Sequence, residues 1–260
     1  MVKRRRWKSK LQVRGVIMKK VVKFGGSSLA NAEQFQKVGD IIRSDESRRY
    51  VVPSAPGKRF DEDIKVTDML YGCYDAASKG EDITEKINAI KARYYEIIKG
   101  LGLSLSLEEE FKKIDEDFRA QAGIQYAASR GEFLNGKIMA AYLGYDFVDA
   151  ASVIRFDKNG NLEAEETNKL LSKKLSKCQS AVIPGFYGAC ADGTVKTFSR
   201  GGSDVTGSLV AKAIHADIYE NWTDVSGFLV TDPRIVHNPE PIEAITYREL
   251  RVLSYMGATV

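Results

Sequence analysis

Lys23-Phe24-Gly25-Gly26-Ser27-Ser28 follows the apolar pair Val21-Val22 and precedes a helix-like run. Two adjacent glycines let backbone N–H groups approach an anion closely, and the start of a helix adds partial positive charge. Lys23 supplies a full positive charge at the same place. The segment therefore predicts a strand, a phosphate-binding turn at Gly25, Gly26 and Ser27, and a helix. An ordinary glycine turn between a strand and a helix is the alternative, and the spacing fits neither GxxxxGK[ST] nor GxGxxG.

A second glycine turn, Ser199-Arg200-Gly201-Gly202-Ser203-Asp204, has the same layout. It follows the strand-like run 195–198 and precedes a helical pattern that begins at Val205. Arg200 can bind a carboxylate or a phosphate through two parallel hydrogen bonds. Asp204 stands where a carboxylate caps the free N–H groups of a helix, so a capping role and a role facing a ligand both stay open.

Strand-like runs alternate with helical patterns along the chain, which predicts an α/β fold. The expected architecture is a three-layer αβα sandwich with a mainly parallel central sheet. Open α/β sheets bind ligands beyond the carboxyl ends of their strands, so both glycine turns are expected to face one site. Helical periodicity also predicts helices over 83–100 and 107–129. The expected strands are 20–24, 50–54, 146–150, 181–186 and 218–222.

The charge of the chain is concentrated at its start. Seven of the 39 Lys and Arg residues precede Met18, so the remaining 32 stand against 35 acidic residues and the net charge there is −3. Residues 18–260 therefore lack the basic footprint of a nucleic-acid-binding protein. No apolar span approaches transmembrane length, so neither nucleic acid nor membrane is an expected partner.

Residues 1–17 lack the apolar core of a secretory signal. We expect a basic leader that is disordered or belongs to a mis-assigned start, with Met18 as the natural start; a tag remnant and a transit segment are alternatives. The three cysteines, Cys73, Cys178 and Cys190, are odd in number and have no metal-type spacing. This pattern is typical of reduced thiols in the cytosol, so a cytoplasmic location is expected.

Five ordered segments resemble the amino-acid kinase superfamily, and more closely the aspartokinases. The resemblance covers residues 18–260 and implies one catalytic domain with the amino-acid kinase fold. It also implies ATP-dependent phosphorylation of the L-aspartate β-carboxylate to 4-phospho-L-aspartate, the first step of lysine, threonine and methionine biosynthesis. The matching segments are 23–28, 51–55 together with 66–68, 129–132, 198–204 and 222–234.

The resemblance assigns roles to individual residues. A zwitterionic substrate needs one cationic and one anionic anchor, and the family supplies Arg200 for a carboxylate and Glu132 for the α-ammonium; the alternative for Glu132 is an acid at a helix start. Lys23 and Asp204 are the expected catalytic residues. The expected substrate-binding residues are Ser54, Thr67, Glu132, Arg200 and Ser203. The expected ATP-binding residues are Lys23, Gly25, Gly26, Ser27, Gly201, Gly202, Thr223, Asp224, Leu229 and Arg234.

ATP and Mg²⁺ are the expected co-substrate and cofactor, and no Mg²⁺ ligand is assigned. Thr259 departs from the family, because many aspartokinases have lysine there in contact with ATP. The sequence ends inside a segment that precedes paired ACT regulatory domains in aspartokinases, so these domains are expected to be absent. A homodimer stays open. Three alternatives remain: a glutamate, acetylglutamate or UMP kinase of the same superfamily; an inactive ligand-binding fragment; and a nucleic-acid binder that rests only on the leader.

Overall fold

Five parallel strands form the central sheet, in the order β3-β4-β2-β1-β7. The computed structural model describes residues 18–199, 201–223, 227, 229, 231, 235–246, 248, 249 and 252, so the basic leader lies outside the described residues. In the centre of the sheet, Phe24 of β1 is in register with Pro53 of β2 and with Trp222 of β7. Three strands thus end level, beside the first glycine turn. The strands are β1 (Lys20–Phe24), β2 (Arg48–Pro53), β3 (Asp146–Phe147), β4 (Ala181–Val182) and β7 (Ile218–Trp222).

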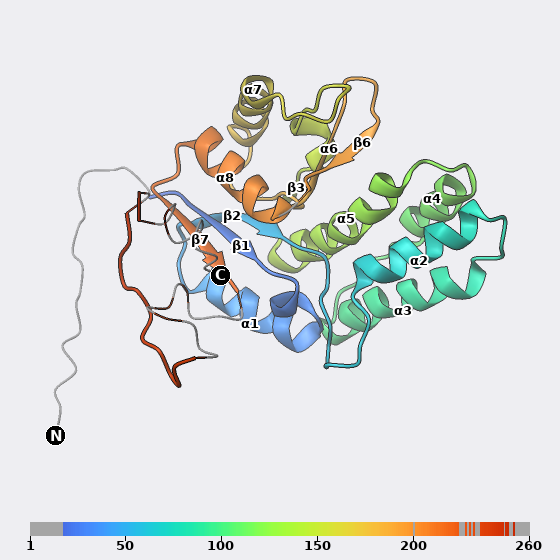
Figure 1. Ribbon diagram of the computed structural model, residues 1–260, viewed down its shortest axis with the longest axis horizontal. Helices are drawn as coiled ribbons and strands as arrows, with labels where there is room; N and C mark the ends of the chain where they lie inside the picture. Colours follow the sequence, from blue (N-terminus) through green and yellow to red (C-terminus); the bar gives the residue numbers. More distant parts are fainter. Residues whose placement is uncertain are drawn as a thin grey trace.

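Helices cover both faces of this sheet (Figure 1). α1 (Ala32–Arg43) and α5 (Ile124–Leu143) pack on one face, and α2 (Val66–Ser78), α3 (Thr84–Gly100) and α4 (Glu108–Arg119) pack around α5. The other face carries three helices and a small antiparallel hairpin. These are α6 (Ala150–Val153), α7 (Ala164–Leu175), α8 (Gly202–Ile214) and the strands β5 (Tyr187–Ala189) and β6 (Val195–Thr197). The three-layer αβα prediction is confirmed.

β1 shows why the sheet needs both layers. Side chains alternate between the faces of a strand, and Val22 and Phe24 enter the core under α1 and α5 while Val21 enters the core under α7 and α8. All three are fully buried. Lys23 shares the α8 face with Val21, which places a cation beneath the second glycine turn.

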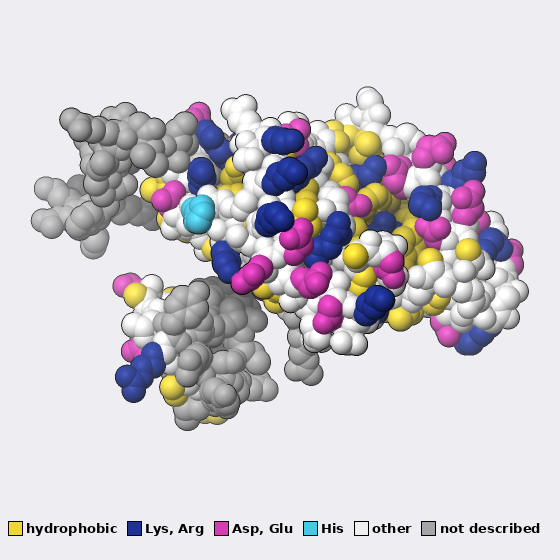
Figure 2. Space-filling view, turned by 90° about the horizontal axis from the view of Figure 1, so that it is seen from above, with side chains coloured by type: hydrophobic (Ala, Val, Ile, Leu, Met, Phe, Trp, Pro, Cys, Tyr) yellow, Lys and Arg dark blue, Asp and Glu magenta, His cyan; other side chains and the backbone are white. Residues whose placement is uncertain are grey.

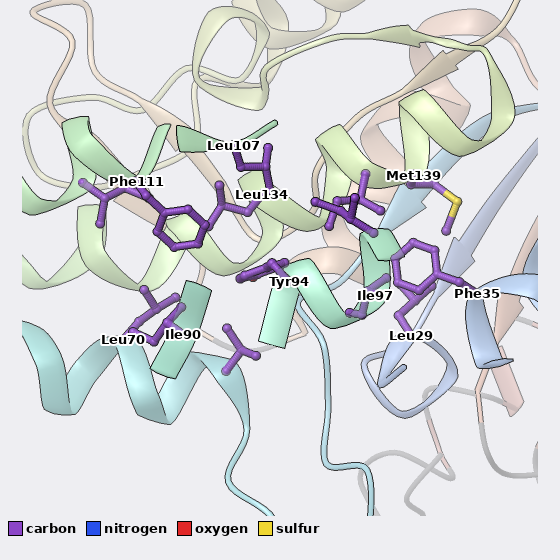
Figure 3. Packing of buried hydrophobic residues seen from close by; sticks show 14 of the residues in the cluster. Leu29, Phe35, Leu70, Ile90, Tyr94, Ile97, Leu107, Phe111, Leu134 and Met139 are labelled. Carbon is purple, nitrogen blue, oxygen red and sulfur yellow. The ribbon is translucent and has the colours of Figure 1, made fainter. Parts of the chain in front are cut away.

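Tyr94 of α3 lies in the middle of the larger core, among apolar side chains from four helices and their connections (Figure 3). Its hydroxyl donates a hydrogen bond of 2.8 Å to the carbonyl of Gly131 in α5. This bond satisfies a buried polar group and fixes α3 against the turn of α5 that carries Glu132. The labelled neighbours in the view include Leu70, Ile90, Leu107, Phe111 and Leu134.

Three of the segments expected from the sequence have clearly different bounds in the structure. The helix expected over 107–129 is two helices, because α4 ends at Arg119 and the link contains Gln121 and Gly123 with φ of +59° and +103°. Such left-handed backbone ends a helix. The expected strands 146–150 and 181–186 are also shorter, since Asp149 caps α6 through the Ala151 N–H and Pro184 has no N–H for a strand ladder.

Basic and acidic side chains are interspersed on the face that carries α7 and α8 (Figure 2). A phosphate backbone requires a concentrated basic surface, and this face does not offer one. Among the described residues, no helix combines the length and the apolar composition needed to cross a membrane.

Candidate active site

Lys23 is the last but one residue of β1 and points at α8. Its ammonium nitrogen lies 2.9 Å from a carboxylate oxygen of Asp204, in the first turn of α8. The lysine is buried, whereas the Asp204 side chain keeps 43% of its surface exposed. The N-cap of α8 is Gly201, so Asp204 holds Lys23 and does not occupy the capping position. The two residues expected to be catalytic are thus in contact.

The first glycine turn is held tightly by its neighbours. The Gly25 N–H donates to the Trp222 carbonyl at 3.1 Å, and the Gly26 carbonyl accepts from the N–H groups of Leu29 and Gly57 at 3.0 and 2.8 Å. The expectation that the Gly25 N–H is available to a phosphate is therefore wrong in this structure, since β7 already uses it. A Cβ on Gly26 would lie 2.9 Å from the Ala55 carbonyl oxygen, which explains the glycine there.

The second glycine turn needs glycine for two different reasons. Gly201 has φ of +54°, a backbone conformation that glycine adopts without steric cost. A Cβ on Gly202 would come within 2.7 Å of the Phe186 ring. Next in the chain, the Ser203 hydroxyl accepts a hydrogen bond of 2.9 Å from the Ser54 hydroxyl. This bond connects the carboxyl end of β2 to the start of α8.

A cleft of about 620 Å³ opens beside the first glycine turn, and none of the described residues of the second turn line it. Five residues expected to bind substrate or nucleotide line it, and they come from four separate parts of the chain. They are Gly26, Ser27, Ser54, Thr67 and Glu132. Thr67 stands in the first turn of α2, and the Ser54–Ser203 hydrogen bond joins the cleft to the turn that carries Asp204.

Glu132 is a buried acid in the middle of α5. The helix begins at Ile124, so the alternative reading of Glu132 as a helix-starting acid is wrong. One carboxylate oxygen has no hydrogen-bond partner among the described residues. Burial raises the pKa of Glu132 to about 8, and nearby backbone N–H groups, the Ala55 N–H foremost, offset this rise in part. A cationic ligand group entering the cleft would supply the missing partner.

Several expected residues stand apart from the cleft. Thr223 follows β7, and Leu229 pairs with Pro241 in an isolated bridge; neither is among the residues that line the cleft. Arg200, Asp224, Arg234 and Thr259 lie outside the described residues.

The connection between β2 and α2 supplies cleft residues that the sequence motifs did not predict. Ala55, Pro56, Gly57 and Lys58 continue from Ser54 along the cleft. The dipeptide Pro56-Gly57 is a recognised turn signal after a strand and could have drawn attention to this loop. Its partner Gly26 lies 31 residues earlier in the chain, so only the fold reveals that the two glycines touch.

No cluster of three or more His, Cys, Asp or Glu residues suited to a metal ion occurs in the described part of the chain. A Mg²⁺ ion carried by nucleotide phosphates needs few protein ligands. The half-exposed carboxylate of Asp204 fits that requirement, because it lies at the glycine turn and can contribute one oxygen.

A strand-end lysine, two glycine turns on one sheet edge and a buried acid in the adjoining cleft make a candidate ligand site of the kind that α/β sheets place at the carboxyl ends of their strands. Residues 18–260 match the Amino acid kinase family, and the chain belongs to this family. Aspartokinases are among the relatives that it matches. Aspartokinase 3 of Bacillus subtilis is 39% identical over 257 residues, which are 93% of this chain and 56% of that protein.

Solved structures give the same family. The aspartate kinase of Clostridium acetobutylicum is 50% identical, with a TM-score of 0.87 over 92% of this chain and 55% of that one. E. coli aspartokinase III in complex with aspartate and ADP is 27% identical, with a TM-score of 0.77 over 92% of this chain and 57% of that one. The chain thus spans little more than half the length of the relatives that it matches.

Proposed function

We propose that this chain is an aspartate kinase catalytic domain over residues 18–260, which transfers the γ-phosphoryl group of ATP to the β-carboxylate of L-aspartate. The observation that carries the proposal is the buried, partly unpartnered Glu132 carboxylate in a cleft that begins at the first glycine turn. The α-ammonium group of the substrate would be the missing partner of the Glu132 carboxylate. The glycine turns would hold the nucleotide phosphates beside it. The family relatives, one of them solved with aspartate and ADP, support this pairing of ligands.

The proposed reaction needs positioning and positive charge more than acid–base catalysis. The aspartate β-carboxylate is ionised at neutral pH, so it attacks without a general base. One carboxylate oxygen forms a bond to the γ-phosphorus, the bond from that phosphorus to the β–γ bridging oxygen breaks, and ADP leaves with the electron pair. The main obstacle is the approach of two anions.

Lys23 is proposed to offset that repulsion. Its ammonium group is buried and oriented by Asp204, so it needs no solvent reorganisation when charge develops on the transferring group. Mg²⁺, when bound to ATP, would neutralise further phosphate charge, and Asp204 is the residue that could contribute a ligand. Ser54, Thr67 and Ser203 would donate neutral hydrogen bonds to the substrate, while Arg200 would bind its carboxylate.

Gly26, Ser27, Gly201 and Gly202 would face the nucleotide, together with Thr223, Asp224, Leu229 and Arg234. The Gly25 N–H is occupied by Trp222, so Gly25 would contribute only by shaping the turn. A homodimer and a cytoplasmic location belong to the same proposal, and sedimentation velocity would measure the first.

The test is ADP formation with a panel of acceptors under saturating MgATP. L-Aspartate is the expected acceptor, and L-asparagine is the matched control because it keeps the α-ammonium and α-carboxylate groups but lacks the reacting oxygen anion. L-Glutamate, N-acetylglutamate and UMP represent the other members of the superfamily. Turnover with one of these three and none with aspartate would move the chain to that activity, and no turnover with any acceptor would indicate an inactive ligand-binding fragment.

A further inference from the structure

Residues 58–65 of the loop between β2 and α2 are held in place by polar contacts and have little apolar packing behind them, whereas Ala55, Pro56 and Gly57 at the start of the loop are buried. Phe60 and Ile64 of this loop expose 57% and 58% of their surface. A cavity of about 680 Å³ lies between the loop and α3, lined by Asp63, Ile64, Met69 and Arg93 among others. With little apolar packing of their own, residues 58–65 depend for their position on hydrogen bonds and ion pairs.

Arg93 of α3 supplies the buried part of that attachment. One guanidinium nitrogen lies 2.6 Å from the Asp63 carboxylate, and another donates to the Gly57 carbonyl at 3.1 Å. The arginine is 5% exposed and the Asp63 side chain 8%. Arg59 contacts the same carboxylate from the solvent side at 2.9 Å, so Asp63 lies between two guanidinium groups. Arg59, with help from Arg93, holds the pKa of Asp63 well below its usual range.

The Gly57 end of this network reaches the cleft. The Gly57 N–H donates to the Gly26 carbonyl at 2.8 Å, while the Gly57 carbonyl is the group that Arg93 binds. Two residues earlier, the Ala55 N–H faces the Glu132 carboxylate. A short segment, Ser54 to Gly57, therefore touches the first glycine turn, Glu132 and Ser203. Arg93, which does not line the cleft, binds this segment at the Gly57 carbonyl.

We propose that Arg93 is a positioning residue, which fixes the Ser54–Gly57 segment between the glycine turn and Glu132 and thereby sets the affinity of the cleft for its amino-acid substrate. The proposal rests on the proposed function for the identity of that substrate. Arg93 does not line the cleft, and its effect passes through the backbone of Gly57. The loop-holding part of the inference is independent of which acceptor the enzyme uses.

The experiment compares Arg93→Met, Arg93→Lys and Lys91→Met in the full chain. Arg93→Met keeps an unbranched apolar stem and leaves Asp63 paired with Arg59, so the protein is expected to fold. Arg93→Lys keeps a charge for Asp63 but cannot reach both partners with a planar fork. Lys91→Met is the matched control on the same helix, since Lys91 pairs with Glu108 of α4, away from the loop.

Trypsin cleavage of the folded protein at Lys58, Arg59 and Lys65 measures how much of the protein has the loop between β2 and α2 open. Cleavage there, identified by mass spectrometry, is expected to be roughly tenfold or more faster in Arg93→Met, intermediate in Arg93→Lys and unchanged in Lys91→Met, because cleavage follows the population of the opened loop. Cleavage at the wild-type rate in Arg93→Met would overturn the proposal. An equal rise in Lys91→Met would also overturn it, because the effect would then be general destabilisation.

Steady-state kinetics measure how the same substitutions change substrate binding in the cleft. The KM for L-aspartate is expected to rise roughly tenfold in Arg93→Met, with a smaller change in kcat and partial recovery in Arg93→Lys. The pH at which the KM changes is expected to move upward, since a displaced Ala55 N–H no longer lowers the pKa of Glu132. Faster cleavage with an unaltered KM would refute the positioning role. If the wild-type chain shows no aspartate-dependent turnover, the proposed function fails, while the cleavage comparison still decides whether Arg93 holds the loop.

Discussion

Lys23 is buried, and within the described part of the chain its ammonium group pairs with one carboxylate, that of Asp204. The ammonium group is held by Asp204 at the point where β1 meets the glycine turn. A fixed charge of this kind contributes most when negative charge moves during the reaction, and less to the binding of a ground state.

Lys23→Ala is therefore expected to lower kcat by roughly a hundredfold or more, while the affinity for ATP changes little. Steady-state kinetics and nucleotide titration of the same preparation measure the two effects. Lys20→Met is the matched control, because Lys20 lies at the opposite end of β1 and pairs with Asp45 and Glu220. An equal loss of ATP affinity with unchanged kcat would make Lys23 a ground-state binding residue.

Glu132 predicts a pH dependence with a definite sign. Its pKa of about 8 in the folded chain stands above the ordinary value of 4.5, so the folded state holds a proton that the unfolded state releases. The stabilisation from this proton is complete below about pH 4.5 and is lost as the pH rises to about 8. Deprotonation leaves a buried charge without a counter-ion, which is costly.

Urea unfolding of the wild type and Glu132→Gln between pH 5 and 8.5 measures this contribution. The wild type is expected to lose on the order of a few kcal/mol relative to the variant over this range, because glutamine has no proton to release. Parallel stability curves for the two proteins would show that the Glu132 carboxyl titrates as an exposed acid does.

Among the elements, the glycine turn and the β2–α2 loop form one unit through Gly26 and Gly57. A Cβ on Gly57 would lie 2.7 to 2.8 Å from backbone atoms of Gly26 and Ser27. Because these neighbouring atoms belong to the backbone, they cannot move aside as the end of a flexible side chain can. The close approach is what brings the loop against the proposed phosphate turn.

Gly57→Ala is accordingly expected to lower the free energy of unfolding by about 1–3 kcal/mol and to weaken nucleotide binding. Gly72→Ala provides the control, because Gly72 is an exposed position of α2 with nothing within 4 Å of an added Cβ. That change is expected to be neutral or to stabilise the protein by about 0.5–1 kcal/mol, since alanine is the better helix former. Both values come from chemical denaturation, and an equally small effect at Gly57 would remove the steric argument.

The elements also show what sequence patterns can reveal. Strand β1 and helix α3 were predicted within a residue of their observed bounds, because alternating or helical periodicity is strong there. The sequence did not predict the break between α4 and α5, because Gln121 adopts a left-handed backbone conformation for which a glutamine gives no sequence signal. Because the start of α5 at Ile124 was not predicted, Glu132 was open to interpretation as an acid at a helix start.

At the scale of the whole molecule, contacts between distant segments explain why part of the cleft could not be predicted from the sequence. Motifs located Lys23, Glu132 and both glycine turns, each of which is a local pattern. The contacts that join them, such as Gly26 with Gly57 and Ser54 with Ser203, span 31 and 149 residues and follow from the parallel sheet. Arg93 belongs to no sequence motif, and only its burial against Asp63 in the structure indicates its role.

The family and the shape of the cleft lead to one chemical expectation, the formation of an acyl phosphate on the aspartate β-carboxylate. Acyl phosphates react with hydroxylamine to give hydroxamates, so the product can be trapped as it forms. The chain is incubated with MgATP, L-aspartate and hydroxylamine, and hydroxamate and ADP are quantified together by mass spectrometry. We expect β-aspartyl hydroxamate in a one-to-one ratio with ADP, and neither product from L-asparagine or from Lys23→Ala over the same time. Aspartate-independent ADP formation, or ADP formed with UMP and without any hydroxamate, would contradict the assignment of this cleft to aspartate.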